Sequence, residues 1–314
     1  MSVRHRLYGD VGTVHRGTFD AAIAPVLTIN PGDTVEVTTL SGNEDNVPPA
    51  DSPFKLSPAH RNVLDNIPRG IGAHLMTGPI EIAGAMPGDE LVVEFLSIEL
   101  ALDWGWNMIK PGTGALPDDF KELRHIFTPI DRARGIVTLP WGLELKAAPF
   151  FGVIGVAPRP QDGPQSSIMP RAWGGNIDNK NLRAGTTLHL PVFNPGAQLS
   201  LGDGHAVQGD GEVCVTAIET ELRGTLRVSL LKQTGIAGPW AETPTHFITM
   251  GFDDDLDQAA KLAVRDMVGL ASRVGRLSRE DAYTLCSVAA DVSVTQLVNV
   301  TKGIHVMLAK DLLK

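Results

Sequence analysis

The chain has 314 residues, of which 43% are hydrophobic and 20% are charged, and its formal net charge is −9. This length and composition suffice for a substantial core, in one large domain or in two closely packed ones. The acidic balance argues against a nucleic-acid partner, because phosphate backbones bind to basic surfaces. Neutral or cationic small molecules are compatible with it.

The sequence shows no sign of export or of a membrane anchor. Its two cysteines, Cys214 and Cys286, are too few for a disulfide framework. The stretch MSVRHRLYGDVGTVHRG lacks the apolar centre of a secretion signal, and there is no run of 18 apolar residues. We therefore expect a cytoplasmic protein without a membrane partner.

The first three quarters of the chain have the pattern of short β-strands separated by turns. Val26–Leu40 and Gly78–Leu100 each contain two β-branched runs around a Pro-Gly-Asp turn. Many strands without helical patterns between them predict a mainly β protein with a β-sandwich or barrel-like body. Further strands are expected at Gly135–Pro140, Phe150–Pro158, Thr186–Phe193, Glu212–Thr220 and Leu226–Lys232.

The pattern becomes helical after Gly251. Asp253–Gly275 carries an apolar stripe at helical spacing, with acidic residues at its start and a glycine at its end. A second helix is expected to begin at Ser278, because Asp281 follows it at capping-box spacing. The final Lys302–Lys314 predicts a short strand. We expect a β-rich catalytic body at residues 1–250 and a helical C-terminal portion at residues 251–314, packed on the same domain.

The segment Gly174–Val213 concentrates glycines and acidic side chains. Extended backbone places residues two apart on the same face of a strand, so such pairs can converge on one centre. Carboxylates and an imidazole suit Zn²⁺, which lowers the pKa of bound water to about 7. Gly-Asp and Asp-Gly are also ordinary turn formers, so spacing alone leaves both a turn and a metal site open. Three pairs have this spacing: Asn176 and Asp178, Asp203 and His205, and Asp210 and Glu212.

Other polar residues are weaker candidates. Asp103 lies beside Trp104 in ALDWGWNMIKPGTG, where the tryptophans either wall a small pocket or plug an aromatic core. His74, in HLMTGP, offers one imidazole ahead of a strand. Cys214 is a candidate nucleophile, although a cysteine between two valines is more typical of an inert strand residue.

Common nucleotide and hydrolase motifs are missing from the sequence. It contains no GxxxxGK[ST] run and no GxSxG elbow. The stretch GDGHAVQGDG also lacks the strand and helix that flank a dinucleotide fingerprint. Nucleotide binding and the common α/β type of serine hydrolase are therefore disfavoured.

The glycine-rich block resembles the signature region of the acetamidase/formamidase family. In that family a GGNxD run, an LPV strand, a GDxH turn and a QGDGE turn follow in this order, as they do in GGNIDNKNLRAGTTLHLPVFNPGAQLSLGDGHAVQGDGEVCVTAIE. The resemblance continues in TGPIEIAGAMPGDELVVEF, FFGVIGVAP and REDAYTLCSVAADVSVTQLVN, and so covers most of the chain. It implies hydrolysis of a short amide, such as formamide or acetamide, to a carboxylate and ammonia. It also implies a β-sandwich-like fold, a divalent metal (zinc or calcium) and a homo-oligomer (dimer, trimer or hexamer).

The polar pairs fall on the family's motif positions, and their individual roles are our hypothesis. We expect Asp203 and His205 to hold the metal, with Asp103 or His74 reaching in from other strands.

The remaining candidates are assigned to catalysis and to substrate binding. Glu212 is the expected general base, and Asn176 the expected donor to the oxyanion. Asp178 completes the catalytic set, and Trp104 and Asp210 are expected to contact the substrate. The alternatives are an amidase with a cysteine nucleophile and a β-sandwich that binds a small ligand or metal without turnover.

Overall fold

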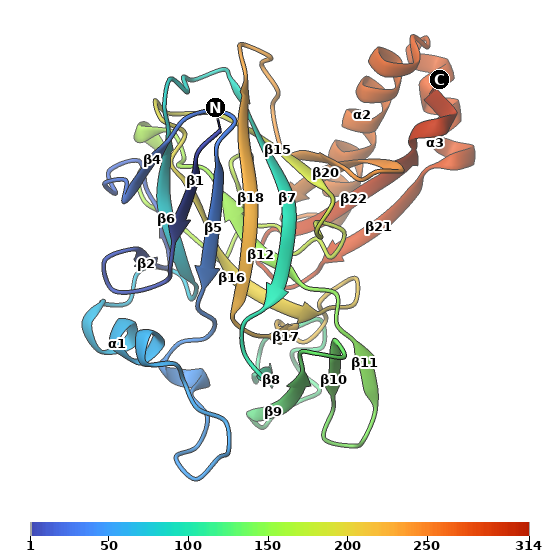
Figure 1. The fold of residues 1–314 in the computed structure, drawn as a ribbon. Coiled ribbons are helices and arrows are strands. Elements are labelled where there is room, and N and C mark those ends of the chain that lie inside the picture. Colours follow the sequence, from blue (N-terminus) through green and yellow to red (C-terminus); the bar gives the residue numbers. More distant parts are fainter. Residues whose placement is uncertain (1, 314) are drawn as a thin grey trace.

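The computed structural model describes residues 2–313, which form two large β-sheets, a two-stranded sheet and three α-helices (Figure 1). The predicted mainly β architecture with helices near the C-terminus is confirmed. Neither large sheet closes into a barrel within residues 2–313, since the strand order of each sheet ends in edge strands that do not pair with each other.

The first large sheet has nine strands. Its neighbours are antiparallel except for the first two, which are parallel. In order across the sheet they are β1 (Arg4–Leu7), β5 (Thr34–Thr39), β18 (Leu222–Leu231), β7 (Glu90–Leu100), β15 (Thr187–Pro191), β19 (Trp240–Glu242), β20 (His246–Asp253), β22 (Lys302–Ala309) and β21 (Asp291–Gln296).

The second large sheet has eleven strands and is built around β16 (Leu199–Val207). The main path runs through β11 (Glu144–Lys146), β10 (Ile136–Thr138), β9 (Arg124–Asp131), β8 (Trp104–Ile109), β17 (Ile218–Glu219), β16, β12 (Phe150–Gly155) and β14 (Gly174–Asn176). β6 (Leu75–Ile82) pairs with β16 and also with β2 (Val14–Arg16) and β4 (Leu27–Ile29). The small sheet pairs β3 (Thr18–Phe19) with β13 (Gln165–Ser166).

The main core lies between the two large sheets and contains buried side chains from both. Phe95 on β7 faces Phe151 on β12, with their ring centroids 6.5 Å apart. The sheets approach closely here because Gly224 on β18 has no side chain: an added Cβ would lie 2.7 Å from the Phe151 ring. The body of the protein is therefore a sandwich, as apolar faces of two sheets require.

The two Pro-Gly-Asp turns connect the sheets instead of closing hairpins. One joins β4 to β5 and the other joins β6 to β7, and each pair of strands is divided between the two sheets. The turn aspartates, Asp33 and Asp89, are buried and accept hydrogen bonds from backbone N–H groups. The chain passes from one sheet to the other at these turns, and the two carboxylates accept hydrogen bonds from backbone N–H groups that would otherwise be unpaired there.

The strand predicted at Glu212–Thr220 is largely wrong. Only Ile218–Glu219 is a strand, and the preceding residues form a loop. Glu212 and Val215 adopt left-handed backbone conformations, with φ of 45° and 83°. A positive φ interrupts extended backbone, so this apolar run cannot continue as a strand.

The C-terminal unit, residues 246–313, combines β20, β21 and β22 with two helices (Figure 1). Both helices begin where the sequence predicts. Asp255 caps α2 (Leu256–Gly275) and Ser278 caps α3 (Arg279–Ala289). The strand expected at Lys302–Lys314 is confirmed as β22, although Lys314 lies outside the described residues. The unit therefore contains strands as well as helices, and its strands continue the nine-stranded sheet.

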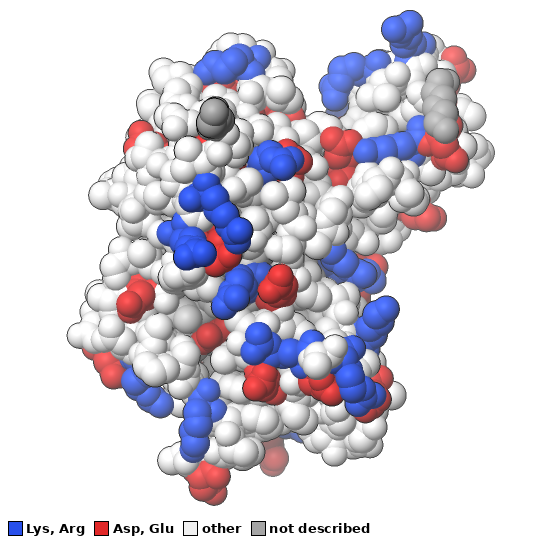
Figure 2. Space-filling model, in the orientation of Figure 1, with Lys and Arg blue, Asp and Glu red and all other residues white. Residues whose placement is uncertain are grey.

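One further helix and three short 3-10 turns complete the fold. The helix is α1 (Pro58–Asn66), and the turns are η1 (Glu44–Asn46), η2 (Pro160–Asp162) and η3 (Lys310–Leu313). No helix within residues 2–313 is long and apolar enough to cross a membrane. Figure 2 shows basic and acidic side chains interspersed on one face, with a notch between the body and the C-terminal unit.

Candidate functional site

The centre of the eleven-stranded sheet carries a row of side chains from neighbouring strands. Residues paired directly across antiparallel strands project from the same face. Phe150 on β12 pairs with His205 on β16, His205 pairs with Glu219 on β17, and Glu219 pairs with Trp106 on β8. The Phe150 ring packs edge-on against the His205 imidazole, with centroids 5.0 Å apart. A carboxylate and an imidazole therefore lie together within an aromatic row.

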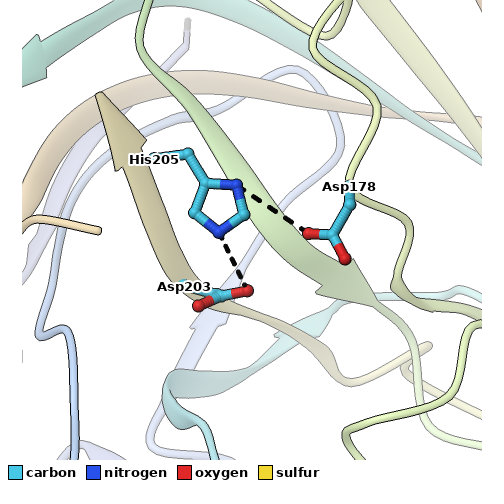
Figure 3. A group of neighbouring side chains, drawn as sticks. All are labelled: Asp178, Asp203 and His205. Carbon is cyan, nitrogen blue, oxygen red and sulfur yellow. Dashed lines mark ion pairs between the residues drawn. The ribbon is translucent and has the colours of Figure 1, made fainter. Parts of the chain in front are cut away.

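Four acidic side chains surround His205, and we call these five residues the carboxylate cluster. His205 Nε2 lies 3.2 Å from Glu219 Oε1 and 3.3 Å from Asp203 Oδ2. His205 Nδ1 lies 3.9 Å from Asp178 Oδ1, so the two aspartates approach the ring from opposite nitrogens (Figure 3). Glu212 completes the cluster, because its carboxylate, His205 and Glu219 offer ligand atoms within 4.8 Å of one another.

Three of the cluster carboxylates depend on unusual backbone. Asp178, Asp203 and Glu212 have φ of 50°, 55° and 45°, in the left-handed region that side chains other than glycine rarely adopt. Such strained conformations collect at functional sites, where the surrounding structure holds them in place. Asp178 and Glu212 also lie outside the strands, so the alternation of a regular strand does not set the direction of their side chains.

A glycine on the neighbouring strand makes room for the cluster. An added Cβ on Gly152 of β12 would lie 2.5 Å from Asp178 Oδ1, 2.7 Å from Asp203 Oδ2 and 2.8 Å from His205 Cε1. All three contacts are shorter than real Cβ atoms make. The cluster therefore occupies the space that a side chain at position 152 would fill.

The cluster is buried except at Asp203, whose side chain is 12% exposed, and it is incompletely hydrogen-bonded. Asp178 and His205 are each 1% exposed, and Glu219 is 3% exposed. Buried polar atoms are nearly always paired, since an unpaired one costs about 1–3 kcal/mol. Four cluster atoms have no hydrogen-bond partner among the described residues: Asp178 Oδ1, His205 Nε2, Glu212 Oε2 and Glu219 Oε2.

Burial and mutual repulsion disturb the pKa of every member. Burial raises the pKa of Glu219 to about 8, and burial together with the charge of Asp178 raises that of Glu212 well above its usual range. Burial likewise raises the pKa of Asp178. The pKa of His205 is raised because the charges of Glu219 and Asp203 outweigh the opposing effect of burial. Burial also opposes ionisation of Asp203, but the nearby imidazoles of His74 and His205 leave its pKa lowered.

These properties fit a divalent cation. Four buried carboxylates cannot all ionise around one imidazole without a compensating positive charge. Carboxylate oxygens and an imidazole nitrogen are also the ligand types that Zn²⁺ accepts. His205 Nε2 and Glu219 Oε2, which have no hydrogen-bond partner among the described residues, are ligand atoms that such an ion would satisfy.

Three residues outside the cluster contact it. Gln208 Oε1 lies 2.8 Å from His205 Nδ1, and Asn299 Nδ2 donates a hydrogen bond to Asp178 Oδ2. His74, an expected metal ligand, lies nearby: its Nε2 is 3.7 Å from Asp203 Oδ2, and its Nδ1 hydrogen-bonds Ser167.

The structure does not bring Asp103, Trp104 or Asp210 to the cluster. The Asp103 side chain is 81% exposed on the turn before β8 and pairs with Arg132, so it is unavailable as a buried ligand. Trp104 is buried, donates from Nε1 to the Lys55 carbonyl and stacks on an aromatic ring, which makes it part of a core.

Asp210 and Glu212 were expected on one face, yet only Glu212 is directed inward. Asp210 pairs with Lys180 at 2.9 Å. The expectation assumed extended backbone, and the left-handed conformation of Glu212 removes that condition.

Asn176, two residues before Asp178, makes no side-chain hydrogen bond to the cluster within the described chain. It is 4% exposed, its Nδ2 donates to the Ile168 carbonyl at 3.3 Å, and its Oδ1 has no hydrogen-bond partner among residues 2–313. Its backbone carbonyl accepts from Asn299, which also contacts Asp178.

Reasoning from sequence missed three residues of the site. Glu219 directly follows the apolar run CVTAI, but Glu221 lies two residues further on and the sequence does not distinguish the two glutamates. Gln208 lies in the recognised QGDGE turn, but nothing in the turn itself indicates a contact with His205. Asn299 gives no local signal, because it reaches Asp178 from 121 residues away.

Nearly the whole chain matches the sequence model of the Acetamidase/Formamidase family, over residues 10–162 and 160–312. A formamidase from Methylophilus methylotrophus is 31% identical over 253 residues, which are 60% of this chain and 61% of that protein. An acetamidase from Mycolicibacterium smegmatis is 27% identical over 203 residues, 45% of this chain and 49% of that protein. The chain thus spans less than two thirds of the length of either relative.

Two solved structures share the fold over almost the full chain. An acetamidase from Bacillus halodurans has a TM-score of 0.84 and 32% identity, covering 98% of both chains. A predicted acetamidase/formamidase from Thermoanaerobacter tengcongensis has a TM-score of 0.86 and 29% identity, covering 100% of this chain and 98% of that one.

Proposed function

Because this chain belongs to the acetamidase/formamidase family, we propose that it hydrolyses a short aliphatic amide to a carboxylate and ammonia. Relatives of the chain are named for formamide and acetamide. The observation that carries the proposal is the buried carboxylate cluster, which places several metal ligands and a proton acceptor at one point.

Asp203, His205 and Glu219 are the residues that we assign to a divalent metal, most simply Zn²⁺. His205 Nε2 faces both carboxylates within 3.3 Å and has no hydrogen-bond partner of its own in the described chain. When bound, such an ion lowers the pKa of a water ligand to about 7 and polarises a carbonyl. His74 supports this set from outside by its contact with Asp203.

Glu212 is the proton-transfer residue in this proposal. Its Oε2 is buried and unpaired in the described structure, so it is free to act on a small molecule. A cation bound beside Glu212 would favour its ionised form, and Oε2 would then take a proton from the water that attacks the amide carbonyl carbon. It would then return that proton to the nitrogen as the C–N bond breaks, which releases ammonia and a carboxylic acid, and the acid loses its own proton to the solvent to give the carboxylate.

Two further residues complete the proposed catalytic set. Asp178 lies on the Nδ1 side of the His205 ring and contributes negative charge to the cluster. Asn176 Nδ2 uses one hydrogen for the Ile168 carbonyl, and its second hydrogen is the donor that we assign to the developing oxyanion.

Cys214 has no catalytic part in this proposal. Its Sγ lies 3.2 Å from Asn107 Nδ2 and 3.6 Å from the Thr216 carbonyl. Neither group can accept the thiol proton in the way that an imidazole base does.

Ammonia release tests the proposal. The purified, zinc-loaded protein is assayed with formamide, acetamide, propionamide, urea and larger amides, and its metal content is measured. We expect release from the smallest amides, and Glu212→Gln should lower kcat/KM by about 10²–10⁴-fold, the usual contribution of a general base.

The matched control is Glu122→Gln, the same change at an exposed glutamate, which should leave kcat/KM unaltered. No ammonia from any amide would favour a binding protein without turnover, and full activity in Glu212→Gln would remove Glu212 from the mechanism. Light scattering during gel filtration tests the homo-oligomer that we also propose.

A further inference from the structure

Gln208 is hydrogen-bonded to two members of the carboxylate cluster at once. Its side chain reaches the His205 ring at Nδ1 and the backbone carbonyl of Asp178, and both contacts are 2.8 Å. It follows the end of β16, three residues after His205. One carboxamide therefore links the strand that carries the imidazole to the segment that carries Asp178.

The chemistry of these contacts fixes which atom of Gln208 faces which partner. A backbone carbonyl can only accept, so the group that faces the Asp178 carbonyl is Nε2, which donates. The group that faces His205 is then Oε1, which can only accept. His205 Nδ1 must therefore carry a hydrogen, whether the ring is neutral or charged.

This hydrogen decides which ring nitrogen can bind a cation. A neutral imidazole with a hydrogen on Nδ1 has its lone pair on Nε2. Nε2 is the nitrogen that faces Asp203 and Glu219 and lacks a hydrogen-bond partner in the described structure. Nδ1 is occupied by Gln208, and Asp178 lies 3.9 Å away on that side.

We propose that Gln208 is a positioning residue that holds His205 as the Nδ1–H tautomer, so that Nε2 is the ligand atom for the metal. The inference rests on the metal site of the proposed function. It adds that Nε2 is the ligand atom of His205 and that Gln208 determines this choice. Acceptors that fix a ligating histidine in this way change metal affinity by about 10–100-fold when they are lost.

The other acceptor near His205 Nδ1 is Asp178 Oδ1, and at 3.9 Å it lies beyond hydrogen-bonding distance. The outer side of Gln208 borders a cavity of about 340 Å³ whose charged lining residues are Lys146, Lys180 and Arg183. Lysine and arginine donate but cannot accept, so they offer nothing to an N–H group. Loss of Oε1 therefore leaves Nδ1–H without an acceptor at hydrogen-bonding distance.

Zinc affinity of three variants tests the inference. Gln208→Leu removes the acceptor, whereas Gln208→Glu keeps an oxygen that accepts from Nδ1. The control is Gln198→Leu. Gln198 is 8% exposed and also donates to backbone carbonyls, but these belong to Ala21 and Ile23, which are not part of the cluster.

Affinity for Zn²⁺ is measured on the full chain by competition with a chromophoric chelator, and thermal melting checks that each variant folds. We expect Gln208→Leu to bind about 10–100-fold more weakly than the Gln198→Leu control. Gln208→Glu should bind within a few-fold of the unaltered protein, because it restores the acceptor. Equal affinity of Gln208→Leu and Gln198→Leu would overturn the inference.

Nitrogen NMR of the zinc-loaded protein, labelled with ¹⁵N at histidine, reads the tautomer directly. The expected His205 spectrum has a proton on Nδ1 and a metal-shifted Nε2, both in the unaltered chain and in Gln208→Glu. A metal-bound Nδ1, or no zinc binding at all, would overturn the inference. Ammonia release without metal would still uphold the amidase, and zinc binding through Nε2 without ammonia release would count against the amidase alone.

Discussion

Asn299 Nδ2 donates a hydrogen bond of 2.5 Å to Oδ2 of Asp178, although the two residues are 121 positions apart in the chain. Asn299 lies on the turn between β21 and β22 of the C-terminal unit, whereas Asp178 follows β14 in the body. Both side chains are buried. The C-terminal unit therefore completes the surroundings of a carboxylate that belongs to the body.

The same part of the C-terminal unit also holds the loop before Glu212. Gly211 N donates to the Thr295 carbonyl, and Leu297 N donates to the Gly211 carbonyl, both at 3.0 Å. Both the N–H and the carbonyl group of Gly211 are therefore hydrogen-bonded, which fixes the backbone next to Glu212. Two of the four cluster carboxylates thus depend on contacts with residues 295–299.

Removal of the Asn299 side chain should impair the site more than the fold. In Asn299→Ala, Asp178 Oδ2 loses its donor inside a closed site, so we expect kcat/KM for amide hydrolysis to fall about 10–100-fold. Asn194→Ala is the control, since Asn194 is equally buried and its carboxamide bonds the Ala157 and Pro158 carbonyls. If both variants lose activity in proportion to thermal stability, Asn299 has only a structural part.

A methyl group at Gly152 should displace the cluster. In Gly152→Ala the new Cβ would lie 2.5 Å from Asp178 Oδ1 and 2.7 Å from Asp203 Oδ2, so the carboxylates must move. We expect kcat/KM to fall by about 10²-fold, as misplacement of reacting groups by about 1 Å can cause. Gly12→Ala, where an added Cβ meets nothing within 4 Å, should have no effect. Unchanged turnover and zinc affinity in Gly152→Ala would contradict the close packing of Gly152 against Asp178 and Asp203.

The zinc-free protein should lose stability as the pH rises, in part through Glu219. Burial raises the pKa of Glu219 to about 8, against 4.5 as its ordinary value. Between these values the folded protein binds more protons than the unfolded one, so the free energy of unfolding falls with increasing pH.

Glu219→Gln removes this titration. Urea unfolding is measured at pH 6 and pH 9 in the presence of a chelator. The free energy of unfolding should fall less between these pH values for Glu219→Gln than for the unaltered chain. Its zinc affinity should be lower, because a ligand is lost. An identical pH dependence in the two proteins would show that Glu219 does not hold a proton in the zinc-free state.

Protonation of His15 should lower the free energy of unfolding at acidic pH. Burial lowers its pKa from 6.5 to about 4. Between these values the unfolded protein binds the extra proton, so the stabilisation by neutral His15 is complete above pH 6.5 and is lost as the pH falls toward 4. At 1.36 kcal/mol per pH unit the loss is about 3 kcal/mol.

Urea unfolding at pH 7 and pH 4.5 measures this loss. His15→Gln keeps a polar group beside Ser200, which His15 Nε2 contacts at 2.9 Å, but does not titrate. It should therefore lose less stability between the two pH values than the unaltered chain. His246→Gln, at a half-buried histidine, is the control. Parallel losses in the His15 variant and the unaltered chain would contradict the prediction.

The sequence alone located most of the elements, because local interactions form them. The β-branched runs on either side of Pro31 and Pro87 are strands, and Asp255 and Ser278 cap the helices that follow them. The division of strands between sheets was not predictable, since both Pro-Gly-Asp turns cross the sandwich and a turn sequence does not specify its partner sheet.

For the site, the spacing in the sequence by itself determined that Asp203 and His205 were candidates to converge, and they do, although Asp203 has a φ of 55° in place of regular extended backbone. Only the tertiary structure decided the remainder. Glu219 arrives through strand pairing, Gly152 provides space on the adjacent strand, and Asn299 comes from the C-terminal unit. These contacts depend on packing between distant segments and on backbone with positive φ at Asp178 and Glu212, and neither is encoded by local spacing.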